Sequence, residues 1–467
     1  MNHLHATLEV LSQDEIELIH QKTAEILEKT GISVPNDRVL ALASEMGAVV
    51  DRKTQVMRIP RAVLNDLIEE TRRQGGMNDR EFHTGHKLGG NVSTQVYLVD
   101  PISRTRRLGV MDDVLKGIAL APHLKNIGKG FATVVPSDVP SRMSDVALYR
   151  ALYQYVEGGG CTYILTPESA RYILEMSKAT GYGIFYLLET VSPFQFQPKS
   201  LEMALLVAEA GFGMGLAPMV ISGASGPITA AGTLTVANAE VLASLFLIRC
   251  ITGRPAAFYG HGTHNMDLRS MTCSFGNPGQ AFFAIASAQM ARYYGMWASS
   301  NSALTDAILP DFQAGFEKGV TATMSALCGA VAVGCQGIAG ADQGFSFEQL
   351  VIDDEWLGYL NYLMDGFTVT EETIAAGLIE EVGIGGNFLA EEHTVDHMAD
   401  SRHTDRLFGR DAWSDAIRDP GNDLLARAHK FVEEKTRGYK TPEPRLSPEL
   451  MRELDRIYAA AERELAN

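Results

Sequence analysis

Two histidines and a cysteine form the first group of residues whose types could do chemistry. His261 and His264 follow a predicted strand, and Cys273 lies nine residues beyond the second histidine. Two imidazoles and a thiolate could hold zinc and activate an alcohol or thiol. Zinc-binding histidines usually lie one turn apart on a helix, whereas these two lie in a loop at a strand end. We therefore favour hydrogen-bonding or substrate-facing histidines and keep zinc as an alternative.

Acids and amides form a second group at predicted strand ends. Carboxylates in such positions are favoured for catalysis in α/β barrels. Glu189 and Asp306 are the stronger candidates, whereas Glu317 falls inside a predicted helix beside Lys318 and could be only a packing or solvated charge. The full group consists of Glu189, Asp306, Asp311, Gln313, Glu317 and Gln343.

Aromatic residues near strand ends form a third group. If several converge they make a box for a cation, each ring face contributing roughly 0.5 to 2 kcal/mol. Ordinary core packing is the alternative for each ring taken alone. Tyr97, Phe345 and Phe347 stand out because they adjoin Gly-rich or polar loops. The other members are Phe131, Phe194, Phe196, Tyr259 and Trp297.

The elements that must position these groups follow an alternating pattern. From residue 127 onward, short strands of apolar or small residues alternate with longer helical segments, which is typical of a parallel sheet closed by crossover helices. We expect a TIM-type (β/α)8 barrel, an α/β fold, with its eighth strand unassigned. Strands should end near Val135, Thr166, Glu189, Ser222, His261, Asn301 and Gln336, with helices over 144–157, 168–180, 200–211, 233–252, 278–294 and 313–328.

Additions flank the predicted barrel. A capping box of Ser12 and Glu15 predicts a helix over 12–30, and further helices are expected over 36–46 and 60–73. We divide the chain into an N-terminal helical layer with short strands (1–110), the barrel (111–369) and a C-terminal helical extension (370–467), treated as one structural unit. The extension should end in a surface helix over 447–465 and pack outside the barrel.

Residues 319–341 carry no formal charge and are long enough to span a bilayer. Eleven of these 23 residues are Gly or Ala, and Cys335, Gln336 and Gly337 interrupt any membrane-facing stripe. We instead predict a helix over 321–328 and a strand over 330–338 that opens on Gln336, Asp342 and Gln343. The acidic segment 342–355 then places Gln343, Phe345 and Phe347 in a loop at the barrel mouth.

Composition limits the classes of partner. The 467 residues carry a formal net charge of -17, so their field repels phosphate backbones and nucleic acid is not expected. The first ten residues lack the pattern of a secretory signal, and we expect a cytoplasmic protein that binds no membrane. The five cysteines include no CxxC pair, which favours reduced, buried thiols. The Gly-rich segments 158–160 and 211–215 are interpreted as turns rather than phosphate cradles.

Five segments together resemble the trimethylamine methyltransferase superfamily. They are SPF (192–194), GPITAAGTLTVANAEVLA (226–243), DAILPDFQAGFEKG (306–319), FSFEQLVIDDE (345–355) and VGIGGNFLAEEHT (382–394). The opening LSQDEIELIHQKTAEILEKTGI is also similar, so the resemblance covers nearly the whole chain. It implies a TIM-type barrel that moves a methyl group from an amine to the Co(I) of a separate corrinoid protein, and a homo-oligomer.

Two departures from that family matter. The archaeal trimethylamine enzymes carry pyrrolysine, whereas every residue here is standard, so the chain resembles the non-pyrrolysine branch with its glycine betaine:corrinoid methyltransferases. Gln280 stands where many relatives carry an acid. The resemblance therefore implies a quaternary amine as methyl donor, with glycine betaine favoured and proline betaine, carnitine and γ-butyrobetaine left open.

Such a reaction needs orientation more than acid–base chemistry, because a quaternary ammonium already has a neutral amine as its leaving group. No tightly bound cofactor or metal is expected, since cob(I)alamin comes on the partner protein. We nominate Glu189, Asp306 and Gln343 as catalytic. Nominated substrate contacts are Tyr97, Phe345 and Phe347 for the trimethylammonium group, His261 and His264 for a carboxylate, and Gln336 beneath the bound amine.

Three other functions stay open at this point. A zinc-dependent alcohol or thiol:corrinoid methyltransferase would use His261, His264 and Cys273. A non-catalytic quaternary-amine binder would keep the barrel and lose the reaction. A generic barrel hydrolase is disfavoured because the chain has no nucleophile elbow and no carboxylate pair at recognisable spacing.

Overall fold

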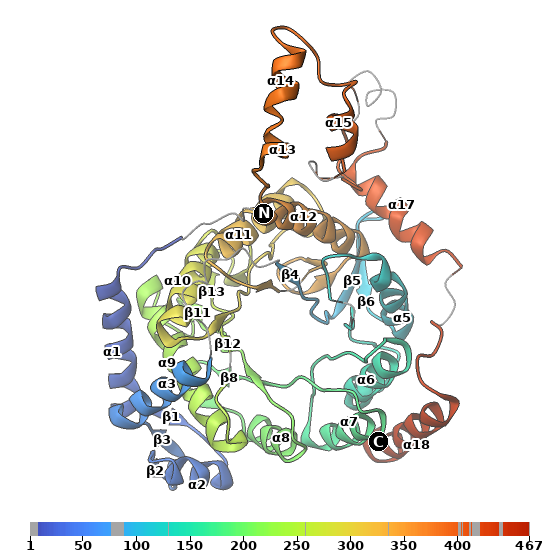
Figure 1. Ribbon diagram of the computed structural model, residues 1–467. Helices are drawn as coiled ribbons and strands as arrows, with labels where there is room; N and C mark the ends of the chain where they lie inside the picture. The colour runs from blue at the N-terminus through green and yellow to red at the C-terminus, as the bar shows by residue number, and fades with distance from the viewer. Residues whose placement is uncertain are drawn as a thin grey trace.

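A computed structural model describes residues 8–75, 88–128, 130–256, 258–334, 336–399, 403, 405–410, 412, 421–438 and 442–466 (Figure 1). Helices form a ring around short strands, a blue N-terminal layer lies against one side of this ring, and an orange helical projection leaves it at another. The architecture is mixed α/β.

The N-terminal layer contains the three predicted helices. Ser12 and Glu15 form the expected capping box at the start of the first of them. Three short strands, which the sequence did not predict here, join the layer to the ring through a five-stranded sheet in the order β2-β3-β1-β9-β8. The helices are α1 (Gln13–Lys29), α2 (Asp37–Glu45) and α3 (Arg61–Gly75), and the strands are β1 (Ile32–Ser33), β2 (Val49–Asp51), β3 (Val56–Arg58), β8 (Thr190–Val191) and β9 (Gln195–Phe196).

Parallel strand pairs line the inside of the ring. The pairs are β4 with β16, β7 with β10, and β12 with β15, and single parallel bridges add Ile127, Val134 and Ser300. β4 supplies the parallel segment that the sequence left unassigned. The sequence did not predict β4 as a strand, because its two glycines have no apolar or β-branched side chains. The strands are β4 (Gly89–Gly90), β7 (Leu187–Leu188), β10 (Gly215–Leu216), β12 (Phe258–Tyr259), β15 (Trp297–Ala298) and β16 (Ala332–Val333).

The described residues do not show the closed eight-stranded barrel that the sequence predicted. Each of the six strands named above is two residues long, their pairs belong to separate sheets, and residues 161–166 form no strand. Glycine weakens a strand interior because it loses more conformational entropy and packs no side chain. The Gly-rich stretches before Cys161 and at β4 therefore disfavour longer ladders there.

Helices surround these strands close to their predicted positions. Residues 347–355, expected as part of a loop over 342–355, instead begin a helix, because Ser346 caps it and its first residues are buried. The uncharged run 319–341 contains the end of α11, as predicted. Where one strand over 330–338 was expected, the described residues form only the two-residue β16 and the start of the separate strand β17 (Ile338–Ala339). The helices are α5 (Met111–Leu120), α6 (Ser144–Tyr155), α7 (Pro167–Thr180), α8 (Pro198–Glu209), α9 (Ala230–Thr252), α10 (Gly279–Tyr294), α11 (Phe312–Leu327) and α12 (Phe347–Asp365).

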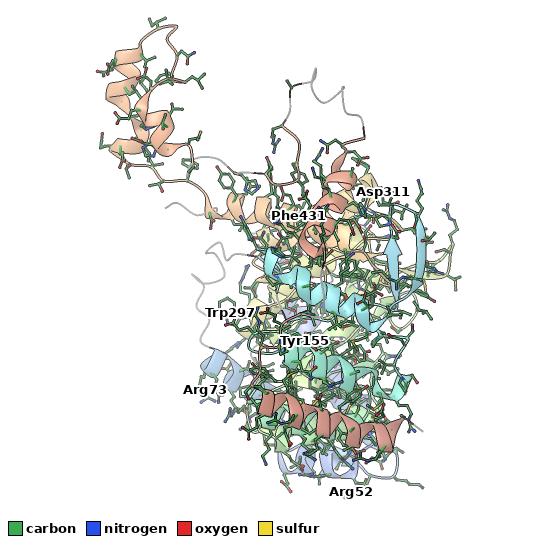
Figure 2. The ribbon with its side chains drawn as sticks, turned by 90° about the vertical axis from the view of Figure 1, so that its right-hand side faces the viewer. Arg52, Arg73, Tyr155, Trp297, Asp311 and Phe431 are labelled. Atoms are coloured by element: carbon green, nitrogen blue, oxygen red, sulfur yellow. The ribbon has the colours of Figure 1, made fainter. Side chains whose placement is uncertain are left out.

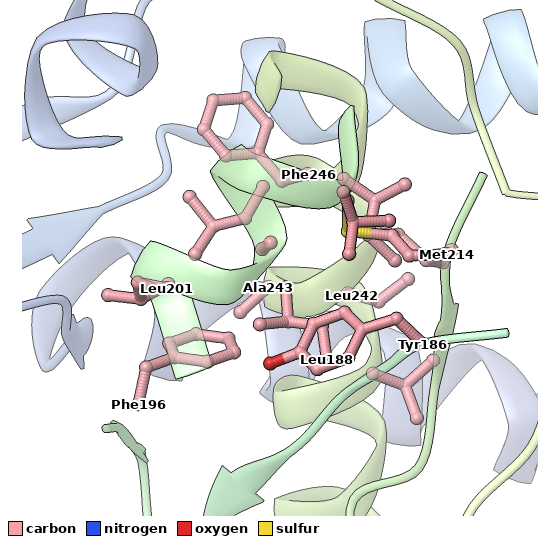
Figure 3. Packing of buried hydrophobic residues seen from close by; sticks show 14 of the residues in the cluster. Tyr186, Leu188, Phe196, Leu201, Met214, Leu242, Ala243 and Phe246 are labelled. Atoms are coloured by element: carbon pink, nitrogen blue, oxygen red, sulfur yellow. The ribbon is translucent and has the colours of Figure 1, made fainter. Parts of the chain in front are cut away.

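The helix α9 is long and apolar enough to cross a membrane, yet most of it is buried inside the protein. Leu242, Ala243 and Phe246 pack against Leu201 of α8 and against Tyr186 and Leu188 of the β7 segment (Figure 3). A buried helix of this kind is apolar all round because it contacts neighbours on every side. We interpret α9 as a core helix.

Two small sheets extend from the strand ends. One has four strands in the order β17-β18-β5-β6, and the other has three strands in the order β11-β13-β14. They bring residues from distant parts of the chain to the same end of the ring. Their strands are β5 (Tyr97–Asp100), β6 (Thr105–Leu108), β11 (Ile221–Ser222), β13 (His264–Asp267), β14 (Thr272–Ser274), β17 (Ile338–Ala339) and β18 (Gly344–Phe345).

The C-terminal part is helical, as the sequence predicted. α18 begins after the cap Ser447 and packs on α6 and α7, where Arg150 Nη2 lies 2.5 Å from Asp455. α17 packs on α12 and α5. The three short helices before it form the projection of Figure 1. These C-terminal elements are α13 (Glu371–Ile374), α14 (Ala376–Val382), α15 (Glu392–His397), α17 (Leu424–Thr436) and α18 (Pro448–Leu465).

Candidate functional site

A hydrogen-bonded group centred on His264 lies at the end of the parallel strands. His264 Nδ1 lies 3.2 Å from Gln280 Nε2, and its Nε2 lies 3.0 Å from Asn301 Nδ2. Gln280 Nε2 also donates to the carbonyl oxygen of Asn301 at 2.6 Å. The His264 ring packs 4.3 Å from the ring of Phe275, measured between centroids. Three segments distant in sequence thus fix one buried imidazole.

Both histidines of this group are neutral at physiological pH. Burial lowers the pKa of His261 to about 4. Burial, assisted by the neighbouring His261, lowers the pKa of His264 to about 3. A neutral imidazole donates at one nitrogen and accepts at the other, so one of the two amides around His264 presents its oxygen to the ring. The pair can orient polar groups but supplies no positive charge.

Polar atoms around His261 lack hydrogen-bond partners within the described part of the chain. They are both ring nitrogens of His261, Thr263 Oγ1, Gln280 Oε1 and Ser287 Oγ. Together with Asn301 they line an interior cavity of about 10 Å³. That volume holds about one water molecule and cannot admit a trimethylammonium group.

Asn301 is a half-buried member of the group and lies between two glycines. A Cβ atom on Gly262 would lie 3.1 Å from Asn301 Nδ2, and one on Gly334 would lie 3.2 Å from its Oδ1. Met219, also close to Gly262, is exposed to solvent. Because the two glycines carry no side chain, their backbones can lie this close to the Asn301 amide. The sequence placed a strand end at Asn301 but did not nominate this side chain.

Glu189 lies on the ring-facing side of the β7 segment. Tyr186 and Leu188 pack into the helical core, so the alternating residues Phe185, Leu187 and Glu189 face the opposite way. Phe185 and Glu189 are exposed on this face. The surrounding protein nevertheless partly desolvates the Glu189 carboxyl and raises its pKa. A carboxylate and an aromatic ring on one face are suited to a cation.

Glu240 of α9 anchors the chain directly after Glu189. Its carboxylate accepts hydrogen bonds from Thr190 Oγ1 at 2.5 Å, Ser192 Oγ at 2.7 Å and the backbone N–H of Phe194 at 2.9 Å. Glu240 is fully buried. A buried carboxylate with three donors fixes the turn and hence the position of Glu189.

Gln336 is buried next to a second polar network. Its Oε1 has no partner among the described residues, and its Nε2 donates to the Gly334 carbonyl at 2.8 Å. The N–H of Gly337 donates to Asp353 at 2.7 Å. Gly337 has φ of 78°, and a Cβ there would lie 2.4 Å from the Phe345 ring, so only glycine fits.

Asp353 accepts four hydrogen bonds. Lys318 Nζ and Gly337 N–H reach Oδ2 at 2.8 and 2.7 Å, while Gln349 Nε2 and Trp356 Nε1 reach Oδ1 at 2.7 and 2.9 Å. Lys318 and Asp353 are both fully buried. This network ties α11 and α12 to the turn that carries Gln336.

Asp342, the neighbour of the nominated Gln343, carries a carboxyl group with a raised pKa. Burial raises the pKa of Asp342 to about 6, against the effect of a 3.0 Å hydrogen bond from Gln95 Nε2. Gly340, Ala341 and Asp342 all have positive φ values. The Gln343 side chain is exposed, and its carbonyl oxygen accepts the Tyr97 N–H. The acid thus belongs to a tightly curved turn that holds it in place.

Asp306 and Glu317 use their carboxylates to hold loops. Asp306 accepts from Ser274 Oγ at 2.5 Å and from the Phe275 N–H at 2.7 Å. Glu317 accepts from Thr305 Oγ1 at 2.6 Å and from the Asp306 N–H at 2.9 Å, and Gln313 also donates to it. Asp311 caps α11. These contacts position the loop behind Asn301 and do not direct Asp306 at a ligand.

The three nominated aromatic rings have other contacts. The Arg106 guanidinium lies 4.5 Å above the Tyr97 ring, and Lys116 lies 5.1 Å above the Phe347 ring. Phe345 is 0% exposed and packs edge to face with Phe347, 5.2 Å away. The structure does not bring these rings together with His261. Phe185 and Phe258 are exposed near the ring strands. The sequence did not single them out as candidate cation contacts, because each falls in an apolar run.

The geometry gives no support to a zinc site. Both ring nitrogens of His264 contact amides, and burial together with Asp306 and Asp342 raises the pKa of the Cys273 thiol to about 12. No group of three or more His, Cys, Asp or Glu side chains in the described ranges is arranged to hold a metal. Cys161 is exposed, contrary to the expectation of buried thiols. Cys335 lies outside the described residues.

Comparison with known proteins decides the family. The profile of the family described as Trimethylamine methyltransferase (MTTB) matches residues 1–466. The chain belongs to the trimethylamine methyltransferase family. The resemblance that the sequence segments carried is thereby confirmed, and the protein is a methyltransferase by family.

Characterised relatives of this trimethylamine methyltransferase family member carry two kinds of name. Trimethylamine methyltransferase MttB of Desulfitobacterium hafniense is 28% identical over 459 residues, covering 93% of this chain and 90% of that protein. MttB of Methanosarcina barkeri is 28% identical over 477 residues, covering 98% and 96%. Glycine betaine methyltransferase of D. hafniense is 27% identical over 475 residues, covering 98% of each.

Solved structures also align with the chain. The Methanosarcina barkeri monomethylamine methyltransferase MtmB covers 91% of this chain and 95% of its own, with a TM-score of 0.47 and 11% identity. The hydroxylamine complex of MtmB covers 95% and 92%, with a TM-score of 0.45 and 9% identity.

Proposed function

We propose that this protein transfers a methyl group from a quaternary amine, with glycine betaine as the leading candidate, to the Co(I) of a corrinoid carried by a separate protein. The C–N bond breaks with its electron pair left on nitrogen, giving dimethylglycine. The cobalt electron pair forms the new Co–C bond, giving methyl-Co(III). No proton is exchanged, so the donor needs no general acid.

The observation that carries this proposal is the neutral polar group around His261. His261 and His264 are uncharged, and several buried polar atoms beside them have no hydrogen-bond partner among the described residues. Nucleophile and cation lose charge together in the transition state, and a partly desolvated interior favours that change. The side chains present are suited to holding a donor in position rather than to attacking it.

For the cation we propose a site on the face of Glu189 and Phe185. Both are exposed on the ring-facing side of the β7 segment, with Leu187 between them. A bound quaternary ammonium would favour the ionised carboxylate and oppose the raised pKa that burial gives Glu189. Since the ammonium loses its charge in the transition state, Glu189 contributes to binding more than to bond breaking. Asn301, with the histidines behind it, would then meet the carboxylate of glycine betaine.

Exposed apolar residues that form a rim at the same end of the ring support the proposal of a protein partner. We define the rim as Ile228, Leu268, Met271, Ile308, Phe312 and Phe316, all exposed and all on segments that follow ring strands. Phe312 is 87% exposed and stacks on Phe316 with centroids 6.1 Å apart. Contiguous exposed apolar surface marks interaction sites. A corrinoid protein docked here would face the ring interior.

The decisive experiment mixes the purified protein with cob(I)alamin and one candidate donor at a time, and follows the cobalamin absorbance spectrum. The donors are glycine betaine, proline betaine, carnitine, γ-butyrobetaine, choline and trimethylamine. We expect methylcobalamin with a quaternary amine and with glycine betaine first. Methylcobalamin with none of the donors would overturn the proposal, and tight binding without transfer would identify a binding protein.

The variant Glu189→Gln tests the cation site. Removing a charge pair that remains open to water costs about 1 kcal/mol, so we expect KM to rise roughly fivefold while kcat stays within about twofold. Glu157→Gln, at an exposed acid in the turn that follows α6, is the matched control. A fall in kcat with KM unchanged would place Glu189 in the chemical step instead.

A further inference from the structure

We propose that two hairpin tips bearing arginines form a docking surface for an acidic protein face at one end of the ring. The first tip comprises residues 100–106, between β5 and β6, and the second comprises residues 267–272, between β13 and β14. This inference rests on the proposed function, because it takes the occupant to be the protein that carries the corrinoid. It adds the charge of that protein's docking face and the residues that meet it.

Both tips lie at the same end of the ring. The turn 340–342 lies between their hairpins, because Cys273 of β14 and Ala341 pack against the same small apolar cluster. On its other side, Asp342 accepts a hydrogen bond from Gln95, two residues before β5. Figure 1 shows β13 and β5 on either side of β4. The two tips therefore flank the ring opening.

The tips are continuous with the apolar rim. Leu268 and Met271 of the second tip belong to the rim, and Arg269 lies between them in sequence. In Figure 2 the cyan strands β5 and β6 lie on the right of the molecule, on the same side as Asp311, which is next to the rim. The first tip adds Ile102, whose side chain is also exposed. Arginine and large apolar side chains together are typical of protein interfaces.

The same turn builds both tips. In each, an aspartate carboxylate accepts the backbone N–H groups two and three residues later, at 2.9 and 3.2 Å for Asp100 and at 2.8 and 3.4 Å for Asp267. Two hydroxyls pair in each turn, and the residue between them has a left-handed φ, 56° at Arg104 and 58° at Met271. Turns of this kind are held by their own hydrogen bonds. A partner therefore meets a preformed backbone, which lowers the entropy cost of docking.

The arginines of the tips are available for a partner. Arg104, Arg106 and Arg269 are exposed, and none of them forms an ion pair within the described residues. Arg107, next along β6, is used differently, because its two terminal nitrogens each lie 2.7 Å from the buried carboxylate of Asp113. That pair fixes the first hairpin to the start of α5. The three other guanidinium groups can each pair with a carboxylate from outside.

The charge of the whole chain favours an acidic protein face over other anions. The formal net charge is -17, so the tips are local positive groups on a molecule that repels acids elsewhere. A compact acidic face is attracted at the tips and repelled by the rest of the surface, which orients it toward the ring opening. Nucleic acid or an anionic membrane is larger than the tips and meets the repelling field as well.

The test compares two methyl acceptors, free cob(I)alamin and cob(I)alamin bound to a corrinoid protein. Several corrinoid-binding proteins are loaded with cobalamin, and the one that accepts methyl groups fastest from the wild type is the probe. The variant Arg104→Glu/Arg269→Glu reverses one charge on each tip. We expect its kcat/KM for the corrinoid protein to fall roughly tenfold at low salt, and the difference from wild type to shrink as sodium chloride is raised. The rate with free cob(I)alamin should not change, which also shows that the variant is folded.

The matched control is Arg52→Glu/Lys53→Glu at the tip between β2 and β3. Asp51 builds the same turn there, accepting the N–H groups of Lys53 and Thr54 at 2.9 and 3.2 Å. Arg52 is labelled at the bottom of Figure 2, away from the rim. The control reverses the same number of charges and should match the wild type with both acceptors.

Three results would overturn the proposal. They are an unchanged kcat/KM of the tip variant for the corrinoid protein, an equal loss in the control, and transfer to free cob(I)alamin but to no corrinoid protein. A tip variant that lost activity with free cob(I)alamin would also overturn it, because the arginines would then act on the reaction rather than on docking. Failure of the wild type with free cob(I)alamin and every donor is a separate result, which overturns the proposed function itself.

Discussion

Two buried polar networks lie at the strand ends, one around Asp353 and one around His261. They differ in how many of their polar atoms have hydrogen-bond partners. Around Asp353, one carboxylate receives four donors, including the buried ammonium of Lys318. Around His261, both ring nitrogens, two hydroxyls and an amide oxygen have no partner in the described structure. Unpaired buried polar atoms cost stability, so each one calls for an explanation. The first network builds the frame, and we propose that the second serves binding.

The largest expected effect comes from breaking the Asp353 network. Lys318→Met leaves a buried carboxylate without its counter-charge, and we expect the free energy of unfolding to fall by about 3 to 5 kcal/mol. Arg150→Met, which breaks an exposed ion pair with Asp455, is the control and should cost about 1 kcal/mol or less. Denaturant unfolding measures both. Equal losses would show that the Asp353 network does not dominate this part of the frame.

The dependence of stability on pH distinguishes the His261 group from the Asp353 network. His261 has a pKa of about 4 in the fold and an unperturbed value of 6.5, so the unfolded chain binds more protons between these limits. Stability therefore falls as pH drops from 6.5 to 4, by roughly 3 kcal/mol for this histidine. Asp342, with its pKa raised to about 6, acts in the opposite sense in that window. The wild type alone therefore shows only a net change.

The variant His261→Asn isolates the histidine's share. We expect the stability of the wild type relative to this variant to decrease by roughly 3 kcal/mol between pH 6.5 and 4. Denaturant unfolding at several pH values gives both curves. Parallel curves would mean that His261 is not held neutral by burial.

Asn301→Ala should affect activity more than stability. The half-buried amide loses one hydrogen bond to His264, which costs about 1 kcal/mol of stability. If the amide positions the donor, kcat/KM for methyl transfer should fall roughly tenfold or more. Asn65→Ala, at an exposed residue of α3, should change neither quantity. A variant with full activity would remove Asn301 from the site.

The smallest effect is expected for Gly262→Ala. The new Cβ would lie 3.1 Å from Asn301 Nδ2 and 3.4 Å from Met219 Cγ, so both neighbours must move by a few tenths of an ångström. We expect the unfolding free energy to change by less than about 1 kcal/mol and the KM for the donor to rise by a few fold. Steady-state kinetics measures the KM. An unchanged KM would show that the interior has room to spare beside Asn301.

Helices of this fold could be predicted from the sequence because their signals are local. Ser12 and Glu15 form the predicted capping box, and apolar spacing marked α6 to α11 within a few residues. β4 could not be predicted, because Gly89 and Gly90 become a strand only through pairing with β16. The prediction for the start of α12 was also wrong. Its acidic residues indicated an exposed loop, whereas Asp353 and Asp354 are buried in ion pairs.

The candidate site was only partly accessible to such reasoning. His264 and Gln336 were nominated from their positions after strands, and the structure buries both in polar surroundings. Whether they act on a substrate stays a prediction. Asn301 and Asp342 were placed near predicted strand ends but were not nominated, because their surroundings come from Gly262, Gly334 and Gln95, which are distant in sequence.

The contact between α1 and α9 has a consequence for how the chain is made. Thr23 of α1 accepts a hydrogen bond from Asn238 of α9, yet α1 ends at Lys29 and α9 begins only at Ala230. Translation at 5 to 20 residues per second separates the two helices by roughly 10 to 40 s. Ile16, Ile19 and Leu27, buried in the finished protein, have no α9 to cover them during that time. The apolar face of α1 therefore has to wait for its final partner until about half of the chain has been made.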